Sequence, residues 1–189
     1  MINQERVETL VQRFPLLLPT AQKLNSASID WMIAGSSCLF VLGNERLPDD
    51  ADISLHDEQH DAADKLFGIK SYIHNSPAGP TRNSNPEGDH SIQLTSRLEF
   101  NFDKKYVFSV TETVNANKIH FNYQGTDMYL LPPEDVLLIK ALLQRGPDEG
   151  KQDIIDIQNF MKIYKIDRGY MSRRIAELGA ESRVNNILL

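Results

Sequence analysis

The sequence has one cysteine, no long apolar run and no excess of positive charge. A single cysteine, Cys38, cannot form an intramolecular disulfide, so we expect a reducing compartment and a cytoplasmic location. No apolar stretch approaches the roughly 18 residues that a membrane span requires, so we expect no membrane partner. Lys and Arg together number 20 against 26 Asp and Glu, and the resulting net charge of −6 supplies no general attraction for nucleic acid.

The remaining composition is that of a globular protein. With 189 residues, 41% of them hydrophobic, the chain fits one compact α/β domain with a helical extension. Cys38 lies in the apolar run 37–42, which predicts a buried structural thiol rather than a reactive one.

Hydrophobic periodicity and turn residues divide the first half of the chain into helices and strands. The pattern predicts helices 3–13 and 19–26, strand 29–34, a helix from Ser36 or Ser37 to Leu42, strand 50–55 and helix 57–67. Residues 75–90 are poor in apolar side chains and rich in Pro, Gly, Asn and Ser, so we expect a mobile loop there.

The second half changes from strands to helices at Pro132-Pro133. The predicted strands are 92–102, 106–110, 118–123 and 128–131, and the predicted helices are about 133–145, 149–163, 168–177 and 180–188. We therefore predict an α/β (α+β) fold with a mixed β-sheet flanked by helices over residues 1–131. A helical carboxyl-terminal subdomain, 132–189, is expected to pack on the sheet and to form one wall of a cleft.

Asp50 and Asp52 are the first candidates for chemistry. Side chains on a strand repeat every second residue, so both carboxylates project from one face of strand 50–55. Two negative charges this close repel unless a cation lies between them, and Mg²⁺ prefers carboxylate oxygens. The pair therefore predicts a divalent metal site. A solvated, acidic edge strand is the alternative interpretation, because the D-x-D pattern is common.

Gly35 and Ser36 are the second candidates. A buried strand ends at Gly35 and a helix follows, and the backbone N–H groups at a helix start bind anions. A phosphate site placed before a metal-binding carboxylate pair is the arrangement that phosphoryl or nucleotidyl transfer requires. An ordinary strand-to-helix turn with a capping serine is the alternative.

His56 and His60 have the i, i+4 spacing of zinc ligands on a helix. No third ligand is evident in the sequence. We therefore expect a solvated helix start there rather than a zinc site.

Two blocks of the sequence resemble the DNA polymerase β-like nucleotidyltransferase superfamily. Gly35-Ser36, followed at residues 46–53 by Arg-Leu-Pro-Asp-Asp-Ala-Asp-Ile, is similar to its Gly-Ser and D-x-D signature. Residues 131–140 resemble a stretch of small stand-alone members, including antitoxin-like and antibiotic-modifying ones. The later residues that continue this second resemblance are Arg145, Lys151, Asp153 and Asp156.

The resemblance implies a nucleotidyltransferase fold and a reaction. A nucleoside monophosphate would move from a nucleoside triphosphate to a hydroxyl group of a small molecule, a protein side chain or an RNA end, with two Mg²⁺ or Mn²⁺ ions. The family carries a third carboxylate on a neighbouring strand, and our candidate is Glu99, on the polar face of strand 92–102. The implied catalytic and metal-binding residues are Asp50, Asp52 and Glu99, and the implied nucleotide-binding residues are Gly35, Ser36, Ser37, Arg46 and Lys140.

Several alternatives stay open at this point. Lys140 could be a lysine on the helix surface, and Glu99 could be a surface strand residue. The protein could be a catalytically weak or inactive member of the fold that serves as a binding module, an antitoxin or a partner subunit. It could also be an α/β interaction domain in which the acidic residues are only solvated. If the site is real, residues 75–90 are expected to close over it.

Overall fold

The computed structural model describes residues 2–76, 78–86 and 91–189. The first elements are α1 (Gln4–Arg13), α2 (Leu17–Ser26), β1 (Trp31–Ile33), α3 (Gly35–Val41), β2 (Ala51–Leu55), a 3₁₀ turn (Asp57–Gln59) and α4 (His60–Phe67). The middle elements are β3 (Tyr72–Ser76), β4 (Gly79–Ser84), β5 (Ile92–Asn101), β6 (Lys105–Ser109), α5 (Glu112–Ala116), β7 (Ile119–Tyr123) and β8 (Thr126–Leu130). The last are α6 (Pro133–Leu143), a 3₁₀ turn (Pro147–Glu149), α7 (Asp153–Ile163), α8 (Arg168–Leu178) and α9 (Glu181–Leu188).

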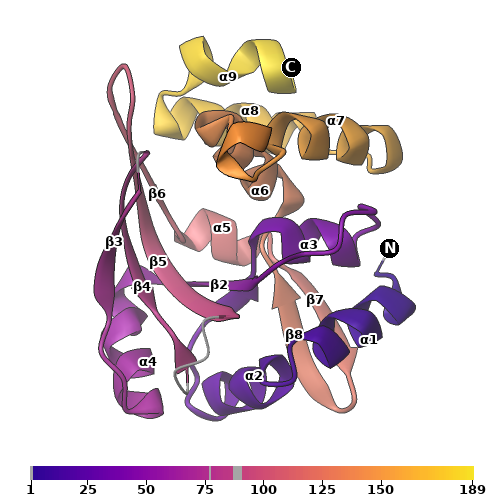
Figure 1. Ribbon diagram of the computed structural model, residues 1–189, viewed down its shortest axis with the longest axis vertical. Helices are drawn as coiled ribbons and strands as arrows, with labels where there is room; N and C mark the ends of the chain where they lie inside the picture. Colours follow the sequence, from indigo (N-terminus) through magenta and orange to yellow (C-terminus); the bar gives the residue numbers. More distant parts are fainter. Residues whose placement is uncertain (1, 77, 87–90) are drawn as a thin grey trace.

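The strands of the described ranges form one mixed sheet (Figure 1). Its order is β3-β4-β5-β2-β1-β8-β7, and β6 pairs with β5 outside this path. β2 runs parallel to β5, and β1 runs parallel to β8, while the other neighbouring pairs are antiparallel. β2 is therefore an interior strand between β5 and β1. The predicted mixed α/β fold is confirmed.

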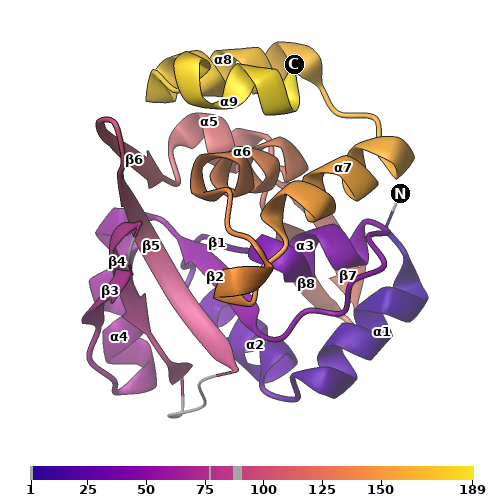
Figure 2. The same ribbon diagram turned by 45° about the horizontal axis from the view of Figure 1, so that its top comes forward.

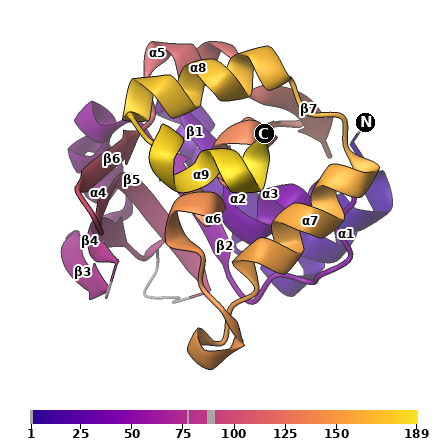
Figure 3. The same ribbon diagram turned by 90° about the horizontal axis from the view of Figure 1, so that it is seen from above.

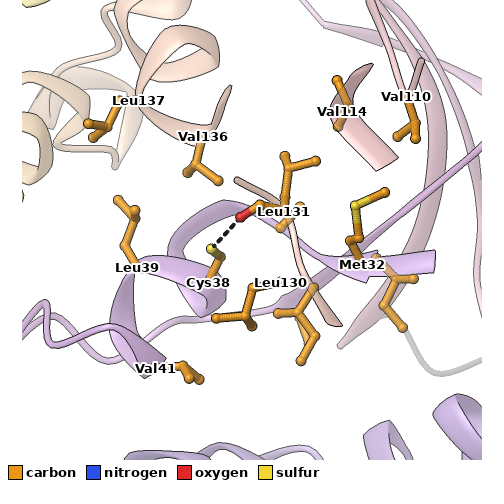
Figure 4. Packing of buried hydrophobic residues seen from close by; sticks show 14 of the residues in the cluster. Met32, Cys38, Leu39, Val41, Val110, Val114, Leu130, Leu131, Val136 and Leu137 are labelled. Atoms are coloured by element: carbon orange, nitrogen blue, oxygen red, sulfur yellow. Dashed lines mark hydrogen bonds between the residues drawn. The ribbon is translucent and has the colours of Figure 1, made fainter. Parts of the chain in front are cut away.

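Strand β1 and helix α3 lie at the centre of the hydrophobic core (Figure 4). All three residues of β1 are buried, as expected for a short apolar strand covered on both faces. The Cys38 thiol donates a hydrogen bond to the Leu131 carbonyl over 3.3 Å. Burial, together with the nearby Glu134 carboxylate, raises the pKa of Cys38 above its ordinary range, so the predicted buried structural thiol is confirmed.

Helix α6 joins the carboxyl-terminal helices to the rest of the protein (Figure 3). It contacts α3 on one side and α7, α8 and α9 on the others, so almost the whole helix is buried rather than one stripe. The four helices predicted after Pro132 are all present. The largest difference in their ends is at α7, which begins at Asp153 instead of residue 149. The division into parts 1–131 and 132–189 stays a prediction.

A buried ion pair holds α8 on α6. The Arg174 guanidinium donates to Asp135 Oδ1 over 2.7 Å, and the Tyr170 hydroxyl donates to Asp135 Oδ2 over 2.5 Å. Asp135 is fully buried and Arg174 is 2% exposed. Burial raises the pKa of Asp135, although Arg174 and Tyr170 oppose this, so the carboxylate depends on both partners to remain ionised.

The expected loop at residues 75–90 is wrong over much of its length. Residues 72–76 and 79–84 form the antiparallel pair β3–β4, and β4 continues the sheet by pairing with β5. The polar composition predicted a loop, but β4 is a polar strand whose buried side chains form hydrogen bonds with other residues of the protein. Thr95 Oγ1, for example, donates to Asn83 Oδ1 over 3.1 Å. Residues 77 and 87–90 lie outside the described residues.

The expected solvated helix start at His60 is also wrong. His60 is fully buried, and its Nε2 lies 3.1 Å from the Ser84 hydroxyl of β4. The helix therefore begins beneath the polar strand that the sequence did not reveal. No group of three or more His, Cys, Asp or Glu side chains suited to a metal occurs in the described part of the chain.

None of the helices in the described ranges is long and apolar enough to cross a membrane.

We expect Arg174→Met to lower the free energy of unfolding by about 3–5 kcal/mol, because it leaves the Asp135 carboxylate buried without its cation. The matched control is Arg173→Met at the exposed neighbouring position, which should change stability by no more than about 0.5 kcal/mol. Urea denaturation at pH 7 measures both. The double variant Asp135→Asn/Arg174→Met should recover part of the loss, since the asparagine carries no charge. Equal losses for Arg174→Met and Arg173→Met would contradict the buried pair.

Candidate functional site

The cleft predicted beside Asp50 and Asp52 is present. A pocket of about 340 Å³ lies between β2, β4 and β5 on one side and α6 with its following turn on the other. Figure 2 shows this turn, in orange, beside β2 and β5. The charged residues that border the pocket are Arg46, Asp50, Asp52, Glu99, Lys140, Arg145 and Lys151.

Asp50 and Asp52 lie on the pocket side of an interior strand. Asp50 directly precedes β2 and Asp52 is its second residue, and both line the pocket. Because β2 pairs with β1 and β5, the alternative of a solvated acidic edge strand is wrong. Burial, followed by the negative charge of Asp50, raises the pKa of Asp52 to about 6, while nearby cations including Lys151 partly offset this rise. The two carboxylates are thus held together at a cost that a bound cation would relieve.

Gly35 allows the backbone to approach Asp52 closely. Its φ is +57°, a left-handed conformation that glycine adopts without strain. A Cβ atom at this position would lie 2.3 Å from Asp52 Oδ2, far inside van der Waals contact. No other residue fits there unless the carboxylate moves. The expected glycine is therefore required by the fold, beside the carboxylate pair.

Ser36 and Ser37 have different surroundings. Ser36 lines the pocket, and its hydroxyl accepts a hydrogen bond from Arg46 Nη2 over 2.9 Å. Ser37 is buried, and its hydroxyl donates to the Asp50 carbonyl over 2.9 Å. The structure therefore places Ser36 and Arg46 where a ligand can reach them. Ser37 instead fixes the start of the carboxylate strand against α3.

Lys140 lies neither on the helix surface nor free in the pocket. The residue is 4% exposed, and its ammonium donates to Asp153 Oδ1 over 3.0 Å and to Asp156 Oδ2 over 2.8 Å. Arg145 also binds Asp153, and Arg46 Nε lies 3.4 Å from Asp156 Oδ1. Burial alone would raise the pKa of Asp153, but the Arg145 and Lys140 cations hold it below its ordinary range. Lys140 is therefore not a surface lysine, and its ammonium is already engaged by two carboxylates rather than free to bind phosphate.

Lys151 and Arg145 are site residues for which the sequence analysis assigned no role. Both line the pocket from the turn between α6 and α7, and both lower the pKa of Asp52 through their positive charge. The Lys151 ammonium has no ion-pair partner among residues 2–76, 78–86 and 91–189. Both residues belong to the second block of the resemblance, so the sequence did mark them. Only the fold shows that the turn that carries them faces the carboxylates.

The structure does not bring Glu99 to the carboxylate pair. Asn83 pairs with Thr95 and Thr81 pairs with Leu98, so one residue of β4 lies opposite two residues of β5 between these pairs. Such a bulge reverses which side chains face the pocket beyond it. Leu98 therefore follows Thr95 on the pocket face, and Glu99 turns away from that face at the pocket edge.

The partners of Glu99 agree with this orientation. Its carboxylate binds Lys105 over 2.5 Å and Arg97 over 2.9 Å, and Lys105, then Arg97, holds the pKa of Glu99 below its ordinary range. Arg97 in turn lies 4.0 Å from Asp57, at the start of the 3₁₀ turn before α4. Strict alternation along strand 92–102 cannot reveal a bulge, and this is why the sequence favoured Glu99.

Comparison with known proteins identifies the fold. No protein-family model matches the sequence, and no curated protein matches it. A protein from Thermotoga maritima assigned as a nucleotidyltransferase superposes with a TM-score of 0.53 at 15% identity, over 79% of this chain and 91% of that one. ANT(2'')-Ia, solved in complex with adenylyl-2''-tobramycin, superposes with a TM-score of 0.52 at 11% identity, over 94% and 95% of the two chains.

The chain has the nucleotidyltransferase fold. The identities to these two structures are too low to carry over their substrates.

The nucleotidyltransferase fold implies divalent metal ions, and the residues of this site fit one of them. Asp50 and Asp52 supply two carboxylates on one face, and burial, then the negative charge of Asp50, raises the pKa of Asp52. The register of β2 on β5 places Gln93 directly beside Asp52. A third carboxylate is absent from this point, and the described residues contain no group of three or more suitable ligands. The residues do not fit the three-carboxylate arrangement expected for two ions.

We expect Gly35→Ala to destabilise the protein more than a matched substitution that has the same backbone conformation. The control is Gly68→Ala, because Gly68 has a φ of +65° and an added Cβ atom there would find open space out to 4 Å. Gly68→Ala should cost about 1 kcal/mol for the left-handed conformation alone. Gly35→Ala should cost about 1–3 kcal/mol more, because the methyl group displaces the Asp52 carboxylate. Urea denaturation compares the two variants, and equal losses would show that the Gly35 contact is unimportant.

The raised pKa of Asp52 predicts how the stability of the protein depends on pH. The folded-state pKa of about 6 lies above the ordinary value of 3.8, so the favourable contribution of this group is present at low pH and is lost as pH rises through about 6. In EDTA, Asp52→Asn should therefore be more stable than wild type at pH 8, by about 3 kcal/mol at most.

This gain in stability should disappear as the pH approaches 4. Thermal and urea denaturation across this range measure it, with Asp49→Asn at the exposed neighbouring position as the control. If both variants follow the same pH profile, Asp52 is not the strained carboxylate.

Proposed function

We propose that this protein binds a nucleoside triphosphate together with a divalent cation and transfers the nucleoside monophosphate to a hydroxyl acceptor. The observation that carries the proposal is the division of charge across one pocket. Asp50 and Asp52 occupy the sheet wall, Lys151 and Arg145 approach from the turn after α6, and Arg46 adds a cation that contacts Asp156 of α7. A triphosphate with a bound cation carries complementary charges for both walls.

The basic side of the pocket supports phosphate binding after its internal ion pairs are counted. Lys140, Arg145 and Arg46 carry three positive charges, and Asp153 and Asp156 carry two negative charges. One positive charge remains, and Lys151 adds a second that is not used in an ion pair within the described ranges. These cations would hold the phosphate oxygens, and the Ser36 hydroxyl with the first backbone N–H groups of α3 would add hydrogen bonds.

Each group of this chain then has a definite role in the transfer. Asp50 and Asp52 would hold the cation, which would offset charge on the triphosphate when bound. Lys151 and Arg145 would orient the phosphates and stabilise the negative charge of the departing pyrophosphate. The acceptor oxygen would form a bond to the α-phosphorus while the bond from that phosphorus to the oxygen bridging it to the β-phosphorus breaks. The bridging oxygen would leave with the pyrophosphate, and the hydroxyl proton would pass to solvent water.

The acceptor side of the pocket favours a small, uncharged hydroxyl compound. β3, β4 and β5 contribute hydrogen-bonding side chains without a carboxylate there, namely His74, Ser76, Thr81, Asn83 and Thr95. Glu99 is already paired with Lys105 and Arg97, so it leaves no free carboxylate for a polycationic acceptor. A pocket of about 340 Å³ also favours a small molecule over a protein side chain or an RNA end.

Nucleotide binding without turnover is the second candidate function. Gln93 beside Asp52 favours it, because the amide supplies no negative charge for a second ion. Binding and transfer are therefore measured separately.

We expect Lys151→Ala to weaken Mg²⁺–ATP binding by roughly tenfold, because one charge-assisted hydrogen bond to phosphate is lost. Binding of adenosine, which has no phosphate, should be unaffected. Lys162→Ala, a charge-matched change on the exposed side of α7, is the control. Isothermal titration calorimetry measures the affinity of wild type and of both variants for Mg²⁺–ATP and for adenosine. Equal affinity for Mg²⁺–ATP in wild type and Lys151→Ala would refute the proposed phosphate position.

Transfer itself is tested by incubating the protein with α-labelled ATP, Mg²⁺ and a panel of neutral sugars and polyols. Labelled acceptor and pyrophosphate should appear together, and both should be absent with Asp50→Asn. Tobramycin serves as the polycationic comparison and should remain unmodified. Tight Mg²⁺–ATP binding without any pyrophosphate release would favour the second candidate function.

A further inference from the structure

Gln93 occupies the position on β5 that lies beside the carboxylate pair. β2 and β5 are parallel, and their register pairs Asp52 with Gln93 and Ser54 with Thr95. Residues paired in this way share a face of the sheet, and neighbouring strands lie about 4.8 Å apart. Asp52, Gln93 and Ser54 all line the pocket. The side chain that the sheet presents to the carboxylate pair from β5 is therefore a neutral amide.

A second divalent ion requires more negative charge than this arrangement supplies. In two-metal sites the ions lie about 3.5–4 Å apart, so shared and flanking carboxylates must offset their repulsion. The Gln93 amide can offer one carbonyl oxygen but no charge. Lys151, Arg145 and Lys140 already place positive charge near Asp52. These cations favour phosphate and oppose a further cation.

No other carboxylate in the described pocket can replace the missing one. The bulge between β4 and β5 turns Glu99 away from the pocket face, where Lys105 and Arg97 hold it. Asp153 and Asp156 are buried and bound to Lys140. Releasing either carboxylate would leave the Lys140 ammonium buried with a single partner, at a large cost in stability.

We propose that the nucleotide site holds one divalent cation per chain and that Gln93 is the residue that prevents a second from binding. The inference rests on the proposed function, because it concerns the same nucleotide site. It specifies how the acceptor hydroxyl is bound in the proposed reaction. The acceptor hydroxyl meets Gln93 and other side chains without a carboxylate rather than a second metal ion, so we expect slow wild-type transfer.

The number of bound ions tests the inference without relying on activity. The full chain is titrated with Mn²⁺ in the presence of α,β-methylene-ATP, which cannot donate its nucleotidyl group, and free Mn²⁺ is followed by electron paramagnetic resonance. Wild type should bind one Mn²⁺ per chain, and Gln93→Asp should bind two. Gln93→Asn matches the aspartate in shape without its charge and should bind one, as should Glu99→Gln.

Two ions in wild type would overturn the inference and leave the proposed function standing, as would one ion in both Gln93→Asp and Gln93→Glu. The glutamate variant keeps the length of the native side chain and provides a second route if the aspartate disturbs folding, which circular dichroism detects. Binding of nucleotide with no Mn²⁺ in wild type would overturn the single-ion inference together with the cation site of the proposed function. Failure of wild type to bind the nucleotide at all would overturn the proposed function as well.

Discussion

The buried ion pairs of Lys140 connect the carboxyl-terminal helices to the functional pocket. Its ammonium lies 3.0 Å and 2.8 Å from two carboxylates of α7, and all three groups are almost fully buried. One of those carboxylates, Asp156, also contacts Arg46, which donates to the Ser36 hydroxyl at the start of α3. A buried charge that loses its partner is strongly destabilising, so this chain of contacts has little freedom to rearrange. It fixes the position of the basic wall relative to the sheet.

The two walls of the pocket differ in charge. The sheet wall carries Asp50 and Asp52 on an interior strand, with Gly35 packed against the second carboxylate. The opposite wall carries cations whose charge is mostly neutralised at the base, near Asp153 and Asp156. The excess positive charge remains at the turn that carries Lys151. Negative and positive groups therefore face each other across the pocket, an arrangement that the proposed triphosphate and its cation would complement.

Much of the fold was predictable because hydrophobic periodicity reports burial. The D-x-D strand, the glycine at the start of α3 and the helices after Pro132 all follow from local pattern, and each is present, although α7 begins later than expected. The errors share a different cause. β4 is a polar strand stabilised by partners such as Thr95, and His60 is buried beneath it, so neither shows the apolar pattern of a buried element. A pattern of side-chain polarity cannot reveal hydrogen bonds between distant residues.

Local pattern likewise predicted part of the site and missed the part that depends on contacts between distant residues. Asp50 and Asp52 follow from strand alternation, but the choice of Glu99 failed at a single inserted residue in β5, which no local pattern marks. Gln93 is a neutral residue, and only the strand register reveals that it lies beside Asp52. Lys140 looked like a surface residue because its two acidic partners lie on another helix. Charged pairs formed across the fold are visible only in three dimensions.

A crystal structure of the protein with Mn²⁺ and α,β-methylene-ATP tests the central claim most directly. The account predicts one anomalous peak bound by both Asp50 and Asp52, with the triphosphate extending toward Lys151 and the Ser36 hydroxyl. A nucleotide bound elsewhere, or an ion coordinated by Glu99 instead of the carboxylate pair, would contradict it.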